Sequence, residues 1–471
     1  MSLLLLPKSH MPAIISTNFR LENANNFRSA LSEAGNKAYV FIGKSDSWSP
    51  TLGDPTEFSA GVDVPATPHN TIVELNDSWQ NMIAMKEITT SGVINMAPRH
   101  DWVASTIYPA WDDNDSFVYD TDNAFYVLTT DFNVYKCVYS PGTASTTKPS
   151  HTTVNPTNPG DGYLWKYMYT IQAVYTDFLT INYMPVKTVL SAPGGGEPDI
   201  TQWNNQVGSA ALDGKIYRIV VVTGGTGYDP SVPPAVTILG DGAGVTATAV
   251  VNASAPFNVT GINVTNTGTS AYNTVNVTVA APVTGTTATA RAVLSPKGGH
   301  GTRAAEELGG FYVGIIVSLE YSEDPEDPEY GNFITDGSFR QLGIIKNPYE
   351  FGTTDVGTET TYSALKHLVV TSPSNIAVGD YIDSSISGAN AYIDSWDSAT
   401  GTLKYHQNDK TGYVPFATGV FTTSTAGSGT ITTIVDQDVE PFSGQILFLE
   451  NRTKIDRSAT QIEDVKLIIE F

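Results

Sequence analysis

The chain has 471 residues, enough for roughly two to four domains and a sizeable buried core. It carries 48 acidic and 25 basic side chains, a formal charge of −23, and its Lys and Arg residues occur singly. Because nucleic acids and anionic membrane surfaces would repel such a chain, the composition argues against both as partners. No stretch approaches the roughly 20 apolar residues of a membrane-spanning helix, so we predict no membrane insertion.

The N-terminus and the single cysteine indicate the compartment. The leucines at positions 3–6 precede Pro7, and this run is far shorter than the apolar region of a secretion signal. Cys137 has no partner for an intrachain disulfide, which suits a reducing compartment. We expect its thiol to be buried in a strand.

The first hundred residues predict two helices and a strand. Residues 16–34 begin with cap-forming Ser, Thr and Asn, continue with helix formers and stop at a Gly-Asn pair. Residues 38–43 form a continuous apolar run of strand length. A second helix is predicted over 78–85, where Trp79, Met82 and Ile83 share one helical face.

An aromatic stripe marks the strand predicted over 163–171. Alternate positions carry Tyr163, Trp165, Tyr167, Tyr169 and Ile171, so these side chains share one face. The stripe could be a platform for a sugar, an interface, or a sheet core facing a second layer. We favour the core, because aromatic rings bury large apolar areas.

Residues 215–294 contain an internal repeat. A Val-Thr pair, Gly-rich turn and tyrosine at 222–228 recur at 264–272, and two short Val/Thr/Ala strands follow each copy. Two copies of one small β unit explain this pattern. Alternating Thr and Val across Gly-rich turns favour strands, so we predict an all-β module inserted in the main body.

The stretch 337–349 reads as a core strand between two insertions. It contains Phe339, Leu342, Ile344 and Ile345 and ends at Pro348, and the adjacent isoleucines favour a strand covered on both faces. A second Gly/Ser/Thr-rich block follows at 357–438. The chain then closes with strands at 444–449 and 465–471.

These elements predict a mainly β fold, with an antiparallel β-sandwich core, a few short helices and two inserted small all-β modules. The predicted core comprises residues 1–213, 297–356 and 439–471. The predicted modules are 214–296, with its two repeats, and 357–438.

Signals for chemistry are weak. Neither a phosphate-binding loop nor a Gly-x-Ser-x-Gly elbow occurs, and the seven histidines lack metal-ligand spacing, so no cofactor, no metal and no catalytic residue is predicted. The acids at 112, 113, 115, 120 and 122 could bind calcium, but they lack the pattern of an EF-hand and favour a solvated turn. A pair of carboxylates acting on a polysaccharide stays open, because their separation is spatial.

Six short motifs, in order along the core, carry a resemblance to a known family. They are Thr17-Asn18-Phe19-Arg20 with Asn26-Phe27; Tyr39-Val40-Phe41-Ile42-Gly43 with Ser47-Trp48-Ser49; Pro98-Arg99-His100-Asp101-Trp102 with Tyr108-Pro109; Pro159-Gly160-Asp161-Gly162-Tyr163-Leu164-Trp165; Phe339-Arg340-Gln341-Leu342 with Asn347-Pro348; and Leu449-Glu450-Asn451-Arg452. Together they resemble the baseplate wedge protein family, gene product eight, of T-even-like contractile-tailed bacteriophages. The resemblance covers roughly residues 15–210, 300–355 and 440–471, and both inserted blocks lie outside it.

The resemblance implies a non-enzymatic virion protein of the tail baseplate, made and assembled in the host cytoplasm. It implies a homodimer that binds other baseplate wedge proteins during tail assembly. We expect interface residues among Trp48, Trp102, Trp111 and Arg452, because Trp and Arg are enriched at binding hot spots. The alternative function is a glycan-binding module that contacts a host surface sugar through the inserted modules, with Tyr228, Tyr272 or other aromatic residues of these modules as the platform.

Overall fold

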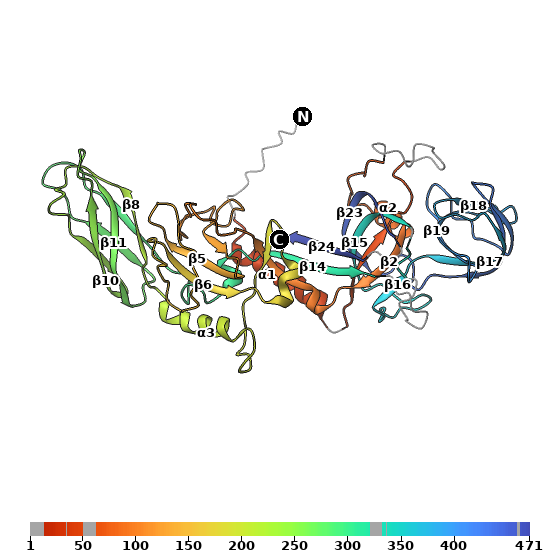
Figure 1. Cartoon of the computed structure of the whole chain (residues 1–471), viewed down its shortest axis with the longest axis horizontal. Coiled ribbons are helices and arrows are strands. Elements are labelled where there is room, and N and C mark those ends of the chain that lie inside the picture. Colours follow the sequence, from red (N-terminus) through yellow and green to blue (C-terminus); the bar gives the residue numbers. More distant parts are fainter. Residues whose placement is uncertain (1–13, 34, 50–62, 321–331, 336, 459–461) are drawn as a thin grey trace, which may run out of the picture. The chain divides into compact units, whose positions relative to one another are not determined.

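The computed structural model describes residues 14–33, 35–49, 63–320, 332–335, 337–458 and 462–471 (Figure 1). The fold is mainly β, with several antiparallel sheets and few short helices, which confirms the predicted fold class. Two compact units divide the chain: unit 1 comprises residues 1–25, 94–314 and 468–471, and unit 2 comprises residues 26–93 and 315–467. The leucines at positions 3–6 lie outside the described residues.

The described residues form short helices and, among their sheets, a three-stranded and a four-stranded one. The helix predicted over 16–34 is confirmed as α1. The helical elements are α1 (Thr17–Ser32), α2 (Ile72–Gln80), η1 (Thr90–Gly92), η2 (Ala173–Phe178), α3 (Ile200–Ser209), η3 (Ala210–Leu212) and α4 (Ala304–Glu307). A three-stranded sheet contains β4 (Tyr126–Leu128), β5 (Asn133–Tyr139) and β6 (Leu164–Thr170) in that order. A four-stranded sheet has the order β24 (Glu463–Glu470), β14 (Tyr312–Leu319), β3 (Val93–Pro98), β7 (Tyr183–Pro185).

The aromatic stripe of β6 lies in the core of unit 1. Tyr163, Trp165 and Tyr167 are buried in one cluster with Tyr135 and Cys137 of β5, which confirms both the core interpretation and the buried thiol. The Tyr163 and Trp165 rings stack with centroids 5.6 Å apart. Burial raises the pKa of the Cys137 thiol far above its usual range. The cysteine is therefore an inert packing residue.

The first inserted block forms a six-stranded sheet within unit 1. Its strands are β8 (Arg218–Thr223), β9 (Val236–Gly240), β10 (Ala243–Val251), β11 (Val259–Ser270), β12 (Val275–Val279) and β13 (Thr289–Val293), in the order β10-β11-β8-β13-β12-β9. An isolated bridge between Ala235 and Thr248 links the two ends of this order. With this bridge, the strand order can be read as a closed ring. Exchanging β8 with β11, β9 with β12 and β10 with β13 then gives every strand the same type of neighbours as before. The two predicted copies thus occupy equivalent places.

Tyr228 and Tyr272 do not form a sugar platform. Their exposed fractions are 5% and 4%, and both belong to the buried cluster of the six-stranded sheet. The Tyr228 hydroxyl accepts a hydrogen bond from Ala288 N at 2.8 Å. The prediction that these tyrosines hold a glycan is therefore wrong, because the repeat uses them to close its own core.

Unit 2 contains a five-stranded antiparallel sheet with β15 in its interior. The order is β16 (Thr361–Ser363), β2 (Met82–Glu87), β1 (Ala38–Gly43), β15 (Ser338–Lys346), β23 (Gln445–Asp456). Seven consecutive residues of β15 are buried, which confirms the strand covered on both faces. Gly343 permits this packing, because a Cβ there would lie 2.3 Å from the Phe41 ring.

The helix predicted over 78–85 is wrong in its second half. Helix α2 ends at Gln80, and Met82 to Met85 lie in strand β2, where all four are buried. A short apolar run that is buried on every side fits a helix and a strand equally well, so its periodicity could not separate the two.

The second inserted block contains a closed barrel within unit 2. Its strands are β17 (Lys366–Ser374), β18 (Tyr381–Asp383), β19 (Asn390–Asp397), β20 (Thr402–His406), β21 (Gly419–Thr423) and β22 (Ser428–Val435), in the order β17-β20-β19-β18-β21-β22. Strand β16 also falls in the predicted 357–438 block, but it pairs with β2 of the five-stranded sheet.

Candidate interaction groove

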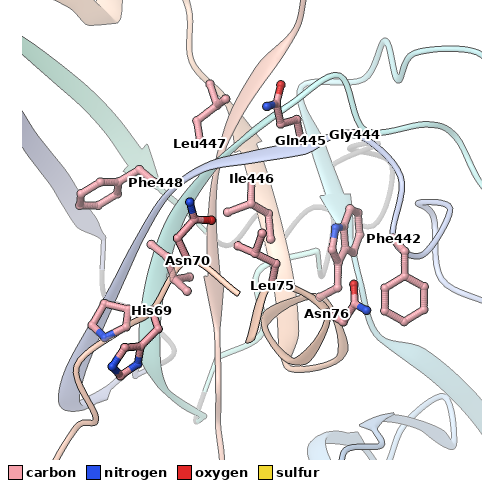
Figure 2. A pocket seen from close by; sticks show the side chains of 13 residues that line it. His69, Asn70, Leu75, Asn76, Phe442, Gly444, Gln445, Ile446, Leu447 and Phe448 are labelled. Carbon is pink, nitrogen blue, oxygen red and sulfur yellow. The ribbon is translucent and has the colours of Figure 1, made fainter. Parts of the chain in front are cut away.

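A groove lies in unit 2 between the start of β23 and helix α2. Its volume is about 670 Å³, within the range of known binding pockets. None of its thirteen lining residues is Asp, Glu, Lys or Arg; they are Pro68, His69, Asn70, Leu75, Asn76, Trp79, Phe442, Gly444, Gln445, Ile446, Leu447, Phe448 and Leu449. In Figure 2, Ile446 and Leu75 lie near each other in the middle, with His69 and Phe442 toward opposite ends. The groove thus combines apolar side chains with amide and backbone polar groups and carries no formal charge apart from what His69 can take up.

Local sequence signals fix the helical wall of the groove. Thr71 caps α2, since its side chain accepts a hydrogen bond from Glu74 N. The Glu74 carboxylate accepts a hydrogen bond from His69 N at 2.8 Å, which holds the approach to the helix. Trp79 is buried against the five-stranded sheet and anchors the other end.

A sharp turn fixes the strand wall. Gly444 has φ +68°, and a Cβ there would lie 2.6 Å from Lys346 O and 2.8 Å from Pro348 N. Only glycine fits this approach to the end of β15. Just before the turn, Phe442 leaves 52% of its surface exposed, and Leu447 beyond it is 39% exposed.

Strand β23 presents an open edge to the groove. It is the last strand in the order of its sheet, paired with β15 alone among the described strands. Six consecutive residues, 444–449, line the groove. Alternate side chains of a strand point to opposite faces of the sheet, so a cavity on one face would touch every second residue. A cavity lined by consecutive residues therefore lies along the edge of the strand. Unpaired backbone groups on an edge are a template for another chain.

The structure brings two of the four predicted interface residues together on β23. Trp48 Nε1 donates a hydrogen bond to Arg452 O at 2.9 Å, so the indole contacts the strand at Arg452. Trp48 is half-buried, whereas Arg452 is exposed and pairs with Glu450 at 2.8 Å. Nearby, Asn451 Nδ2 donates to Ala66 O.

The other two predicted residues lie in unit 1. Trp102 is half-buried, and its Nε1 donates to Ser145 Oγ at 3.2 Å. Trp111 is only 8% exposed; Lys136 Nζ lies 4.2 Å from its ring centroid and His300 packs against its edge. The interface role of all four residues stays a prediction, and Trp111 has the least surface to offer. Sequence reasoning missed Phe442, which lies in the turn before β23, and Leu447, whose signal was an apolar strand without polar alternation.

A buried charge cluster joins the barrel to the five-stranded sheet of unit 2. His406 Nδ1 lies 2.7 Å from the Asp394 carboxylate, and Lys410 Nζ lies 2.6 Å from that of Asp46. Lys44 Nζ is 3.0 Å from Asp46. Burial opposes the charge on His406, but both carboxylates outweigh it and raise its pKa to about 9. Burial likewise opposes ionisation of Asp46, but His406 and both lysines hold its pKa well below its ordinary value.

The acidic stretch after Trp111 is an ion-pair anchor. Asp112 pairs with Arg218 of β8 and lies 2.6 Å from Arg291 of β13, and Asp113 lies 3.0 Å from Arg291. Both arginines belong to the six-stranded sheet, so the cluster ties that sheet to the rest of unit 1. The two predicted alternatives, a calcium loop and a solvated turn, are therefore wrong for Asp112 and Asp113. In the described ranges, no group of three or more His, Cys, Asp and Glu side chains is arranged to hold a metal ion.

Comparison with known proteins finds a similarity to a phage protein over part of the chain. No family model matches the chain. The chain is 25% identical over 197 residues to the baseplate wedge protein gp8 of Enterobacteria phage T4, a match that covers 34% of this chain and 55% of the relative. The chain thus spans about half the length of the relative that it matches. Among the residues that the structure describes, no helix combines the length and apolarity needed to cross a membrane. Over the matched part, the chain is similar to a phage baseplate protein.

Proposed function

We propose that this chain is a structural subunit of a contractile-tail baseplate, where it forms a homodimer and binds other wedge proteins during tail assembly. The similarity to a baseplate wedge protein carries the proposal. The open edge of β23 beside the groove supports it, because an unpaired strand edge is a site where another polypeptide can add. We place the protein in the tail of the virion, after synthesis and assembly in the host cytoplasm.

The proposed role is not enzymatic. The relative is a structural protein, and the groove is lined by apolar and amide side chains, with His69 as its single titratable group. Such a lining suits binding better than general acid–base chemistry, which needs a positioned proton donor and acceptor. The charge of −23 keeps an unassembled subunit soluble until its partners arrive.

Light scattering and co-purification test the proposal. The purified chain should have the mass of a dimer, and it should co-purify with other wedge proteins of the same phage when they are expressed together. Trp48→Ala and Arg452→Ala should weaken that co-purification, with the exposed Val283→Ala as a matched control. A strictly monomeric chain that joins none of these proteins would contradict the proposed function.

A further inference from the structure

Helix α3 packs against strand β6 of the three-stranded sheet through a polar face (Figure 1). All four of its buried residues are polar: Gln202, Asn205, Gln206 and Ser209. Gln206 is satisfied by the backbone of Val189, which donates to Oε1 at 3.0 Å and accepts from Nε2 at 2.8 Å. Asn205 instead meets a lysine of β6, because Lys166 Nζ lies 3.4 Å from its Oδ1. A buried carboxamide and a buried amine are therefore in contact.

Lys166 is a buried lysine without a carboxylate of its own in the described part of the chain. Its side chain is fully buried, and Nζ donates to the neutral Val154 O at 2.6 Å as well as to Asn205. The nearby Glu307 carboxylate lies 2.8 Å from a second buried lysine, Lys136. Burial without a paired counter-charge opposes the ammonium form and lowers the pKa of Lys166 to about 8. A neutral, nucleophilic amine is thus accessible near neutral pH.

Two groups beside Lys166 can carry a proton. Gly301 brings them close, since a Cβ on it would lie 3.2 Å from Lys166 Nζ, and its N donates to Glu307 Oε1 at 2.7 Å. His300 is 3% exposed, and its Nδ1 lies 3.9 Å from Glu307 Oε2 with no hydrogen-bond partner among the described residues. Burial holds the pKa of His300 well below its ordinary value, so the ring is neutral and one of its nitrogens can accept a proton. Glu307 and His300 are therefore the proton carriers of this cluster.

We propose that Lys166 and Asn205 join in an intrachain isopeptide bond, which fixes α3 to β6 covalently. The neutral Lys166 amine attacks Cγ of Asn205, a bond from Nζ to Cγ forms, and the bond from Cγ to Nδ2 breaks. Nδ2 leaves as ammonia, with a proton that Nζ gives up through Glu307 or His300. One amide replaces another, so the reaction needs no oxidant, reductant or further reactant. The inference goes beyond the proposed function and does not depend on it.

The fold holds the two groups in position for this reaction. Lys166 and Asn205 are 39 residues apart in sequence, and their contact turns a bimolecular attack into an intramolecular one, for which reacting atoms about 3–3.5 Å apart suffice. The carboxamide is fixed, because Nδ2 donates to Thr152 O at 2.8 Å and to Thr201 O at 3.2 Å. The product is a neutral amide, so the reaction removes a buried amine that lacks a counter-charge. Burial also keeps water from competing with the amine.

Mass spectrometry of the full-length chain tests the bond. After prolonged incubation, the protein should be lighter than its sequence by the mass of one ammonia molecule, and a protease digest should contain a branched peptide in which Lys166 is joined to Asn205. Lys166→Met and Asn205→Ala should each keep the full mass. The matched controls are Lys297→Met and Asn204→Ala, an exposed lysine of unit 1 and the exposed neighbour of Asn205 on α3, and both should still lose ammonia.

The digest separates this bond from other losses of ammonia. An asparagine that cyclises to a succinimide also loses ammonia, but it leaves Lys166 free, so only the branched peptide supports the inference. A chain with its full mass, or one that loses ammonia without this branch, overturns it. These results decide on the wild-type protein alone, even if a variant fails to fold. A free Lys166 leaves the baseplate role standing, and a monomeric chain that binds no wedge protein would contradict that role without affecting the bond.

Discussion

Loss of the proton from His406 at alkaline pH should weaken the attachment of the barrel to the five-stranded sheet. The imidazole lies between Asp394 and Asp46 with Lys44 and Lys410 around them, and its pKa is raised from 6.5 to about 9. A group whose folded pKa is raised stabilises the protein fully below the unfolded pKa, and the contribution is lost as pH rises through the folded pKa. The loss should therefore occur between pH 6.5 and about 9. Its size is about 3 kcal/mol, from a pKa change of roughly 2.5 at 1.36 kcal/mol each.

Pulse-labelling hydrogen exchange after equilibration in urea measures this loss locally. Samples are equilibrated at several pH values and labelled at one common pH, and peptides covering β19 and β20 report the unfolding of the barrel. Wild-type protein should lose stability across the window, whereas His406→Gln should start less stable and show a flat profile.

A second histidine of the barrel supplies the control. Burial lowers the pKa of His367, so His367→Gln should alter the pH dependence of stability only below pH 6.5 and leave the slope in the alkaline window as in wild type. If wild type and His406→Gln fall with the same slope between pH 6.5 and 9, the charge cluster is not the source of the pH dependence.

Three further predictions concern packing. Glu307→Gln should destabilise unit 1 by about 3–5 kcal/mol in urea unfolding, because Lys136 Nζ, 2.8 Å away and buried, loses its counter-charge; Glu306→Gln should be nearly neutral, because the half-buried Glu306 pairs only with the exposed Arg303. Gly444→Ala should lower the stability of unit 2 by at least about 1–2 kcal/mol, from the left-handed backbone alone. Replacement of residues 366–436 by a short Gly-Ser linker should leave a soluble folded remainder by circular dichroism and light scattering, and aggregation would show that the barrel is integral.

That deletion is feasible because both attachment points of the barrel meet on the five-stranded sheet. Asp438 N donates to Ser363 O at 3.0 Å, and Ser363 N donates to the Asp438 carboxylate at 2.8 Å. A two-residue linker can therefore close the gap without moving β16. A cut at residue 357 would instead remove β16, with the buried Tyr362 that packs edge-on against Tyr39.

Sequence patterns correctly predicted those helices and strands whose determining residues all lie within one short segment. The caps and helix formers of α1, the apolar run of β1 and the aromatic stripe of β6 each specify one structure. The pattern failed at Met82 to Met85, where burial on all sides removes any periodicity. It also failed at Asp112, because its partners Arg218 and Arg291 are 106 and 179 residues away in sequence.

The groove could not be predicted for the same reason. Sequence identifies 444–449 as a strand, but the open edge depends on pairing with β15, about a hundred residues earlier, and on the absence of a further described strand beyond β23. Trp48 was selected for its residue type, and its position beside Arg452 comes from a contact across 404 residues. Residue type can thus suggest hot spots, whereas topology decides which of them share a surface.

The two halves of β23 are treated differently, and this difference favours a binding role for the groove. Proteins usually block an exposed strand edge with charges, prolines or covering loops, because an open edge invites uncontrolled pairing. Here Trp48 and Ala66 contact the half around 451–452, and charged side chains continue from there to Asp456. The half at 444–449 has none of these devices among the described residues and exposes Leu447 instead. An edge protected along one half only would be an aggregation hazard in a free subunit, and it is consistent with a subunit whose open half is covered by a partner on assembly.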